Sequence, residues 1–493
     1  MRILLVYPEF PDTFWSFRHA LRFIRKRASA PPLGLLTVAA LLPESWEKRL
    51  VDMNVTRLTD NDLAWADSVF LSAMVAQRES VKEVVQRCRG AGVRIVAGGP
   101  LFIAEHDEFP EVDHFVLNEA ELTLPPFLRD LEAGRPQHVY ETCEYADMTQ
   151  SPTPLWRLVD LKPYASMCLQ YSRGCPFGCD FCSVTAMLGH RFRTKTAAQV
   201  TAELDVLYGL GWRGGVFFVD DNFIGNKARL KREVLPALIR WRKGKKGMTF
   251  NTEASVNLAD DPELMDLMTR AGFDTVFVGI ETPDDNALRE CNKAQNRGRD
   301  LVAAVKTMQR AGLQVQGGFI VGFDSDTPSI FRRQVEFIQK SGVVTAMVGL
   351  LNAPKGTKLY DRLEQEGRLE GAFTGDNTNN TMNFRPRMDP EMLREGYRTI
   401  MEGIYAPQAY NQRVRTYLAE YKPRAQVQRV LTWEYGLAFV RSVLHLGILG
   451  KERLEYWKLL SWTIVRKPRL FPDAITLAIY GFHFRRICET YVF

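Results

Sequence analysis

The first 140 residues alternate short apolar runs with helical patterns. The apolar runs predict five strands, in the segments RILLVY, RLVDMN, SVFLSAM, VRIVAGGP and DHFVLNE. Residues 34–43 predict a helix that ends at Pro43, because proline cannot donate the next backbone hydrogen bond. Strands that alternate with helices indicate a parallel sheet covered on both faces. We therefore expect residues 1–140 to form a doubly wound domain whose ligands bind at the carboxyl ends of the strands.

The same alternation returns after a proline-rich stretch. Residues 141–165 are weakly periodic and are typical of a linker. Residues 166–350 predict six further strands, in MCLQYS, GGVFFVDD, TFNTEAS, TVFVGIE, VQGGFIVGF and TAMVGLL. Helical segments such as PELMDLMTRAGF lie between them. Six β–α units favour a partial (β/α)6 barrel with its site at the carboxyl ends of the strands.

The strand pattern stops near residue 350, and residues 351–493 predict a helical domain. From Arg424 onward the chain has 11 Lys or Arg, 5 Asp or Glu and 12 aromatic residues. One interpretation is a helical cap over the barrel mouth. The other is contact with anionic lipid headgroups, for which Trp433, Trp457 and Trp462 are suited. The two interpretations are compatible.

The composition limits the number of domains, the partners and the cellular compartment that fit this chain. The chain has 493 residues, a length that predicts more than one domain. Its composition, 46% hydrophobic and 25% charged, is typical of folded soluble proteins. The net charge of +6 is small, and no nucleic-acid-binding signature accompanies it, so we expect no nucleic-acid partner. We see no apolar run of membrane length and no signal-peptide pattern. We expect a cytoplasmic protein, with contact at the inner membrane surface as an option, in which the eight cysteines stay reduced.

Residues 175–182 read CPFGCDFC and place Cys175, Cys179 and Cys182 in one loop. Structural zinc needs four protein ligands, usually as two separated pairs, and His190 would be an unusual fourth ligand. Buried cysteines without a metal are expected on an apolar face instead. A 4Fe-4S cluster takes four ligands, so three cysteines leave one iron open to a small chelating molecule. The loop favours a cluster over zinc or no metal.

The segment SRGCPFGCDFC, after the first barrel strand, resembles the radical S-adenosylmethionine (SAM) superfamily. In that family SAM chelates the fourth iron. The resemblance implies SAM contacts at strand ends, from Asp220, Asp221, Asn222, Glu253, Glu281, Gly318 and Gly322. The run GGVFFVDDN departs from the Gly-Gly-Glu that is often found there. Each residue also has an ordinary structural interpretation, as a helix cap, a turn or a close-packing glycine. Their shared position at strand ends favours a ligand site.

A flavodoxin-like (Rossmann-type) domain before such a barrel resembles the cobalamin-dependent (class B) radical SAM enzymes. Segments such as YPEFPDTFWSF and PPLGLLTVAALLP are similar to the hopanoid C-2 methylase subgroup. The resemblance implies cobalamin contacts by Asn54, Ser72, Gly98 and Gly99. Asn54 stands where many cobalamin domains have a histidine, so we expect no histidine below the cobalt. A domain that has lost its cofactor is the alternative.

The resemblance implies a methyltransferase that uses a 4Fe-4S cluster, SAM and cobalamin. It would add a methyl group to an unactivated carbon of a hydrophobic molecule through a 5′-deoxyadenosyl radical, with electrons from a donor such as flavodoxin or ferredoxin. One alternative is a radical SAM enzyme that forms C–C bonds, cyclises or rearranges its substrate without methyl transfer. Another is a non-catalytic protein that binds the cluster and cobalamin.

Overall fold

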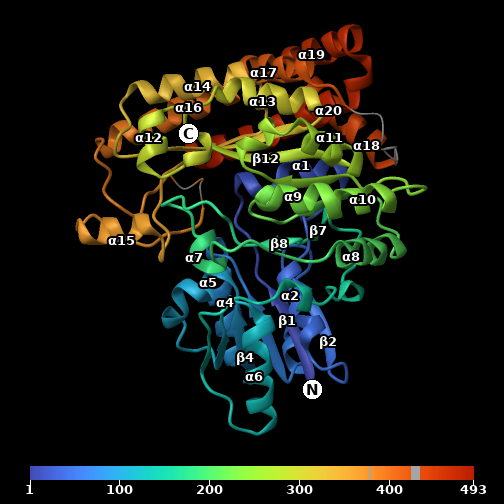
Figure 1. Cartoon of the computed structure of the whole chain (residues 1–493), viewed down its shortest axis with the longest axis vertical. Helices are drawn as coiled ribbons and strands as arrows, with labels where there is room; N and C mark the ends of the chain where they lie inside the picture. Colours follow the sequence, from blue (N-terminus) through green and yellow to red (C-terminus); the bar gives the residue numbers. More distant parts are fainter. Residues whose placement is uncertain (377, 379, 424–432) are drawn as a thin grey trace.

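The computed structural model describes residues 1–376, 378, 380–423 and 433–493. An N-terminal α/β domain, a second α/β unit and a set of helices follow one another along the chain and are stacked in that order in Figure 1. The predicted fold class is therefore confirmed. Arg424, where the basic C-terminal stretch begins, and residues 425–432 lie outside the described residues.

The N-terminal sheet has six parallel strands in the order β2-β1-β3-β4-β5-β6. They are β1 (Arg2–Tyr7), β2 (Glu47–Asp52), β3 (Ser68–Ser72), β4 (Arg94–Gly98), β5 (His114–Val116) and β6 (Val139–Tyr140). The first five are the predicted strands. The sequence pattern did not predict β6, because two residues are too few to give a periodic signal.

Helices cover both faces of this sheet. They are α2 (Leu33–Leu41), α3 (Asp60–Trp65), α4 (Arg78–Gly90), α5 (Pro100–Glu105) and α6 (Ala120–Glu132). Alternate residues of β1 face opposite layers, as the pleat requires. Ile3 and Leu5 pack with residues of α2 and α6. Leu4 and Val6 pack with residues of α3, α4 and α5.

The second unit contains all six predicted barrel strands, paired in parallel in the order β14-β13-β12-β11-β10-β7. They are β7 (Ser166–Leu169), β10 (Gly215–Phe218), β11 (Phe250–Glu253), β12 (Phe273–Glu281), β13 (Gln314–Val321) and β14 (Ala346–Leu350). Strands β7 and β14 are the two edges of this sheet, so it is an open, partial barrel. A separate antiparallel hairpin joins β8 (Ser172–Arg173) to β9 (Arg193–Thr194).

Helices accompany these strands along the chain. They are α7 (Val184–Leu188), α8 (Ala197–Gly209), α9 (Lys227–Arg229), α10 (Leu235–Trp241), α11 (Pro262–Ala271), α12 (Asp285–Glu290), α13 (Leu301–Ala311) and α14 (Ser329–Ser341). The segment PELMDLMTRAGF, predicted to be helical, contains α11. Its helix begins with a proline at the first position and ends before Gly272, whose φ of +106° suits a left-handed cap.

The C-terminal part is helical, as predicted. Its helices are α15 (Lys358–Gln365), α16 (Pro390–Tyr405), α17 (Pro407–Glu420), α18 (Trp433–Ser442), α19 (Arg453–Arg466) and α20 (Phe471–Ile487), with π-helical turns η11 (Val443–Ile448) and η13 (Cys488–Val492). Helix α16 covers the β14 edge, where Tyr405 donates a hydrogen bond to the Ala346 carbonyl oxygen (2.6 Å). Within the described residues, every helix is too short or too polar to cross a bilayer.

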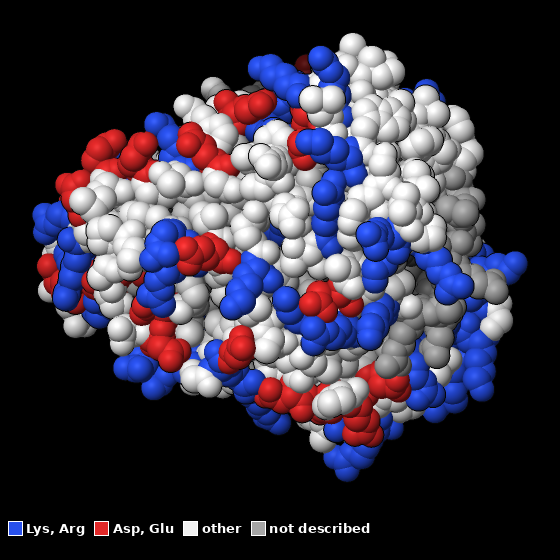
Figure 2. Space-filling view, turned by 90° about the horizontal axis from the view of Figure 1, so that it is seen from above, with Lys and Arg blue, Asp and Glu red and all other residues white. Residues whose placement is uncertain are grey.

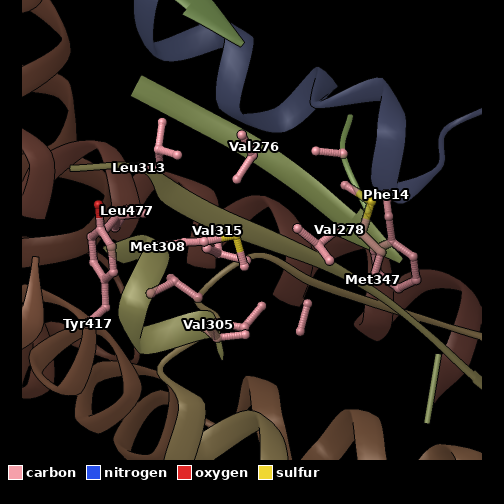
Figure 3. Close-up of a cluster of buried hydrophobic side chains, with 14 of the residues drawn as sticks. Phe14, Val276, Val278, Val305, Met308, Leu313, Val315, Met347, Tyr417 and Leu477 are labelled. Atoms are coloured by element: carbon pink, nitrogen blue, oxygen red, sulfur yellow. The ribbon is translucent and has the colours of Figure 1, made fainter. Parts of the chain in front are cut away.

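The loop after β1 ties the three parts together. Phe14, in the 3-10 turn η1 (Phe14–Ser16), is fully buried in the same core as the barrel strands. Figure 3 shows its ring beside Val278 and Met347. The ring also lies 5.8 Å from that of Phe484 on α20. The N-terminal segment, the barrel and the C-terminal helices therefore share one hydrophobic core.

Candidate active site

The three cysteines lie on a loop that follows β7 and the short strand β8. In Figure 1 this region, marked by β8 and α7, lies between the N-terminal domain and the barrel. Gly174 begins the loop with a φ of +86°, and a Cβ atom there would lie 2.5 Å from the Arg191 carbonyl oxygen. Only glycine fits that close approach without strain. All three cysteines are partly exposed, so their thiols can reach a ligand.

Two buried amide side chains reach these thiols. The Nδ2 atom of Asn222 lies 3.9 Å from the sulfur of Cys175, and the Nε2 atom of Gln295 lies 3.7 Å from the sulfur of Cys179. Burial raises the pKa of the Cys182 thiol to about 12. A bound metal must offset this cost, because a thiol binds metal as the thiolate. Amide donors toward sulfur stabilise that charge.

Three carboxylates and one lysine stand near the thiols. Burial raises the pKa of Glu253 to about 8, and the neighbouring Asp221 and Asp220 carboxylates add to the shift. The Asp221 side chain is open to solvent, yet protein surrounds it on most sides and raises its pKa to about 6. Lys293 donates to the Oε1 atom of Glu281 at 2.6 Å. Burial alone would lower the pKa of Lys293, but Glu281 and the cysteine thiols raise it above the ordinary range.

Glu281 ends β12 in an unusual conformation. Its φ is +63°, a left-handed backbone value that residues other than glycine and asparagine rarely adopt. The register of β12 against β13 shifts between Gly279 and Glu281. The ion pair with Lys293 and the hydrogen bond from Gln334 to the Glu281 carbonyl oxygen (3.1 Å) hold this strained residue. Strain of this kind is concentrated at ligand sites.

Asp220 and Asn222 turn away from Asp221. Asp220 is fully buried and accepts hydrogen bonds from the backbone N–H of Tyr171 (3.2 Å) and from the N–H and hydroxyl of Ser172. Its carboxylate therefore fixes the chain just before the cysteine loop. The Oδ1 atom of Asn222 accepts from the Ser255 N–H (3.2 Å) after β11. Of the three residues predicted to contact SAM here, Asp221 alone keeps its side chain open.

Gly318 and Gly322 have structural reasons to be glycine. A Cβ atom on Gly318 would lie 3.0 Å from the ring of Phe277 on β12. Gly322 follows β13 with a φ of +106°, and its N–H donates to the Asp326 carboxylate (2.8 Å). These contacts explain the glycines by packing and turn geometry. An adenine contact stays a prediction.

Three of the residues predicted to contact cobalamin meet at one edge of the N-terminal sheet. Ser72 ends β3 and Gly98 ends β4, at neighbouring positions in the paired strands. Gly99 has a φ of +94°, and a Cβ atom there would lie 2.5 Å from the Ser72 hydroxyl. A Cβ on Gly98 would lie 2.5 Å from the Val116 carbonyl oxygen. The sequence pattern thus marks a tight turn at the carboxyl edge.

Asn54 lies in the turn after β2, and both ends of its amide are engaged. Its Oδ1 atom accepts from the Phe10 N–H (2.9 Å). Its Nδ2 atom donates to the Pro8 carbonyl oxygen (3.1 Å) and to the Asp52 carboxylate (2.7 Å). Asn54 therefore holds the loop after β1, which gives it a structural role at the position where a cobalt-binding histidine was considered.

The segment after α12 contributes to the site although the sequence pattern did not predict it. It supplies Lys293 and Gln295 to the site, and Asn292 donates to the Gly178 carbonyl oxygen inside the cysteine loop (2.9 Å). The Oε1 atom of Gln295 is buried and has no partner within the described protein. The sequence signal for this segment was the polar run NKAQN, which has no helical periodicity and lies downstream of the strand TVFVGIE.

A buried ion network joins the cysteine loop to the N-terminal domain. Arg173 on β8 donates to Glu119 (2.7 Å) and to Glu121 (2.9 Å), both beyond the carboxyl end of β5. Arg193 on β9 also pairs with Glu119 (2.7 Å). The four side chains are between 4% and 12% exposed. Two cations thus neutralise two anions at the contact between hairpin β8–β9 and the residues beyond the carboxyl end of β5.

Comparisons with known proteins agree with this arrangement. Residues 26–128 match the B12 binding domain, residues 169–338 match the Radical SAM superfamily, and residues 357–492 match a domain of unknown function, DUF4070. An uncharacterized methyltransferase from Synechocystis sp. is 39% identical, covering 99% of this chain and 92% of that protein. A hopanoid C-2 methylase from Rhodopseudomonas palustris is 33% identical, covering 94% of this chain and 90% of that protein.

Two solved structures share the fold. The cobalamin-dependent SAM radical enzyme OxsB, with aqua-cobalamin bound, superposes with a TM-score of 0.61 at 14% identity, covering 99% of this chain and 79% of that chain. The radical SAM methyltransferase TsrM from Kitasatospora setae, with cobalamin and a 4Fe-4S cluster bound, has a TM-score of 0.59 at 16% identity and covers 99% of both chains. At these identities the likeness concerns architecture.

The domain order and the cysteine loop define a B12-binding radical SAM protein. The relatives narrow this class: the chain belongs to the family of cobalamin-dependent radical SAM methyltransferases that includes the hopanoid C-2 methylase. A 4Fe-4S cluster, SAM and cobalamin are the cofactors of this family.

Proposed function

We propose that this enzyme adds a methyl group to an unactivated carbon of a hydrophobic substrate of the lipid, isoprenoid or hopanoid-like class. The observation that carries the proposal is the 33% identity to a hopanoid C-2 methylase over 94% of the chain. The geometry supports it, because the three-cysteine loop lies beside carboxylates at barrel strand ends and is ion-paired to the B12-binding domain.

The donor set fits the cofactors. The three thiols on one loop would hold a 4Fe-4S cluster, which takes four ligands, and would leave one iron open for SAM. Asp221 and Glu281 outnumber the single Lys293 beside them, and Glu253, whose raised pKa of about 8 keeps it largely neutral, would ionise beside a bound cation. This balance suits the ammonium and sulfonium groups of SAM. When bound, SAM and cobalamin supply the 5′-deoxyadenosyl radical and the methyl group, and the protein supplies position and water exclusion.

Each residue then has a distinct task. Cys175, Cys179 and Cys182 hold the cluster, while Asn222 and Gln295 orient two of these thiols. Asp221 is the open carboxylate and binds the SAM ammonium group. Ser72, Gly98 and Gly99 form the edge against which cobalamin lies. Asn54 shapes that edge through the loop after β1, and a cobalamin held there would meet an engaged amide at this position instead of an imidazole. A flavodoxin or ferredoxin supplies the electrons.

Anaerobic turnover of the reconstituted, reduced enzyme tests the reaction type. Methylation predicts S-adenosylhomocysteine together with 5′-deoxyadenosine and a product heavier by one methylene unit. Deoxyadenosine alone, with no gain of a methylene, would indicate C–C coupling, cyclisation or rearrangement. No SAM cleavage at all would leave a non-catalytic binding protein.

The lipid profile of a host strain with and without the gene tests the substrate class. A lipid that is heavier by one methylene and disappears on deletion identifies both reaction and substrate. An unchanged hopanoid profile in a strain that makes hopanoids would exclude the hopanoid-like class. Within this proposal the enzyme works in the cytoplasm, and its C-terminal region meets the inner membrane surface where such substrates reside.

A further inference from the structure

The C-terminal helices expose an unusual amount of apolar surface. Ten of the 19 exposed large apolar side chains in the described residues lie between positions 433 and 465. On α18 and η11 they include Trp433, Val440, Leu444 and Ile448, whose spacing places them along one helical face. On α19 they are Leu454, Trp457, Ile464 and Val465. Contiguous exposed apolar surface marks an interaction site.

The two rows of side chains meet where η11 packs on α19. The indole N–H of Trp457 donates to the Gly447 carbonyl oxygen (2.9 Å), so its half-exposed ring bridges the two elements. Leu449 and Leu454, 67% and 70% exposed, flank the turn between them. We call this continuous surface, from Trp433 to Val465, the apolar ridge.

Positive charge surrounds the apolar ridge. Residues 433–470 contain seven Lys or Arg and three Glu. Each of the three acids faces a cation: Glu434 faces Lys26, Glu452 faces Arg485 and Glu455 faces Lys458. Figure 2 shows the side where the C-terminal helices lie as a broad uncharged area bordered by Lys and Arg. Apolar side chains within a cationic border match the surface of an anionic bilayer.

A basic cavity adjoins one end of the apolar ridge. Its volume is about 740 Å³, and its lining combines one acid, Glu9, and residues 53–56 of the turn that holds Asn54 with five cations: Arg18, Arg22, Lys26, Arg27 and Arg57. Lys26 lies 3.4 Å from Glu434, and Arg25 lies over the Trp433 ring at 5.9 Å. The cavity therefore opens beside the first turn of α18, where it adds to the cationic border.

We propose that the apolar ridge docks the enzyme on a bilayer that contains anionic lipids. The apolar side chains enter the interface, and the surrounding cations face lipid phosphates. The inference deepens the proposed function, because a membrane-resident substrate gives docking its use. The exposure of the apolar ridge and the charge around it do not depend on the reaction that the enzyme catalyses.

Vesicle flotation of the reconstituted full-length enzyme tests the docking. It should bind vesicles of phosphatidylcholine with phosphatidylglycerol, release from them at high salt, and bind pure phosphatidylcholine vesicles weakly. Replacing Leu449 and Leu454 together by serine should lower the vesicle partition coefficient at least about tenfold. The matched control replaces Val206 and Leu210 on the barrel side, also exposed, by serine and should leave binding unchanged.

A charge-reversal variant separates the electrostatic part. K451E combined with R453E should weaken binding to anionic vesicles by about fivefold or more for each cation lost. Equal binding by the wild type and the L449S/L454S variant would overturn the proposal. So would a dimer that the same variant dissociates in light scattering while no form binds vesicles, because the apolar ridge would then join two copies of the chain.

The reaction is monitored separately by SAM cleavage without vesicles. The ridge variants should cleave SAM as the wild type does, because they lie outside the cofactor sites. Vesicle binding by an enzyme that methylates nothing would contradict the proposed function and support docking. Methylation of a solubilised substrate by an enzyme that never binds vesicles would support the proposed function and contradict docking.

Discussion

Asp220, Asp221 and Asn222 follow one strand and do three different things. Asp220 ties down the chain before the cysteine loop, Asn222 links Cys175 to the loop after β11, and Asp221 keeps its carboxylate open. A sequence motif read as one ligand site therefore divides into two positioning residues and one candidate contact. These three residues differ because successive side chains point in different directions and the backbone turns where the strand ends.

Replacing Cys179 by alanine should abolish SAM cleavage. The variant loses one of the three protein ligands, and the two remaining thiols are too few to hold the cluster in position for SAM. Iron content, the visible spectrum and 5′-deoxyadenosine formation measure the effect. Cys143, which is exposed and outside the loop, is the control, and C143A should behave as the wild type. A C179A enzyme with an intact cluster and full turnover would contradict the assignment.

Replacing Asp221 by asparagine should weaken SAM binding by about tenfold, because a charge-assisted hydrogen bond is lost. The cluster spectrum should stay unchanged, which distinguishes a ligand contact from a structural role. Equilibrium binding of SAM to the reconstituted enzyme measures the change. Asp285→Asn, at an exposed position on α12, is the matched control. Unaltered SAM affinity in D221N would remove Asp221 from the site.

At the scale of elements, α20 shows how one helix can be tied to the N-terminal loop. His483 on α20 is fully buried, and its Nε2 atom donates to the Phe14 carbonyl oxygen (3.1 Å). Burial lowers the pKa of His483 to about 4, and the nearby His19 acts in the same direction while Asp12 opposes it. The ring is therefore neutral in the folded protein at neutral pH.

This histidine predicts a loss of stability in acid. Between about pH 6.5 and pH 4 the unfolded chain binds a proton at His483 that the folded chain does not, so stability falls as pH falls. The contribution is about 3 kcal/mol across that window. H483Q should be less stable than the wild type at pH 7, and the gap should narrow toward pH 4. Urea unfolding at several pH values measures it.

The control for that experiment is Val206→Gln, at an exposed position on α8 that carries no titratable group. Its stability difference from the wild type should not change with pH over the same window. A gap between H483Q and the wild type that stays constant from pH 7 to pH 4 would mean that His483 does not govern the acid response.

At the scale of the whole molecule, an ion network joins the B12-binding domain to the barrel through Arg173, Arg193, Glu119 and Glu121. It links hairpin β8–β9, next to the cysteine loop, with the end of β5. Buried pairs of this kind add little net stability compared with apolar side chains of similar size, but removal of one partner is strongly destabilising.

Replacing Glu119 by glutamine should cost about 3 kcal/mol, because two buried arginines lose a shared anion. The variant should also form more 5′-deoxyadenosine per methylated product, since the methyl donor and the radical source are no longer held in register. Unfolding and product ratios measure the two effects. Glu79→Gln, in an exposed pair with Lys82, should change neither. An unchanged product ratio in E119Q would show that the network serves stability alone.

Local sequence patterns were enough to predict the α/β architecture, all six barrel strands and the loop that carries three cysteines. Periodicity and thiol spacing are local properties: β14 is a fully buried apolar run, and β13 alternates buried with partly exposed residues. Only the folded chain brings Lys293 and Gln295 into the site. Only there does the Asn54 amide hydrogen-bond to the loop after β1. The fold also brings Phe14 into the barrel core. Each of these depends on contacts between residues far apart in the chain, which no local pattern encodes.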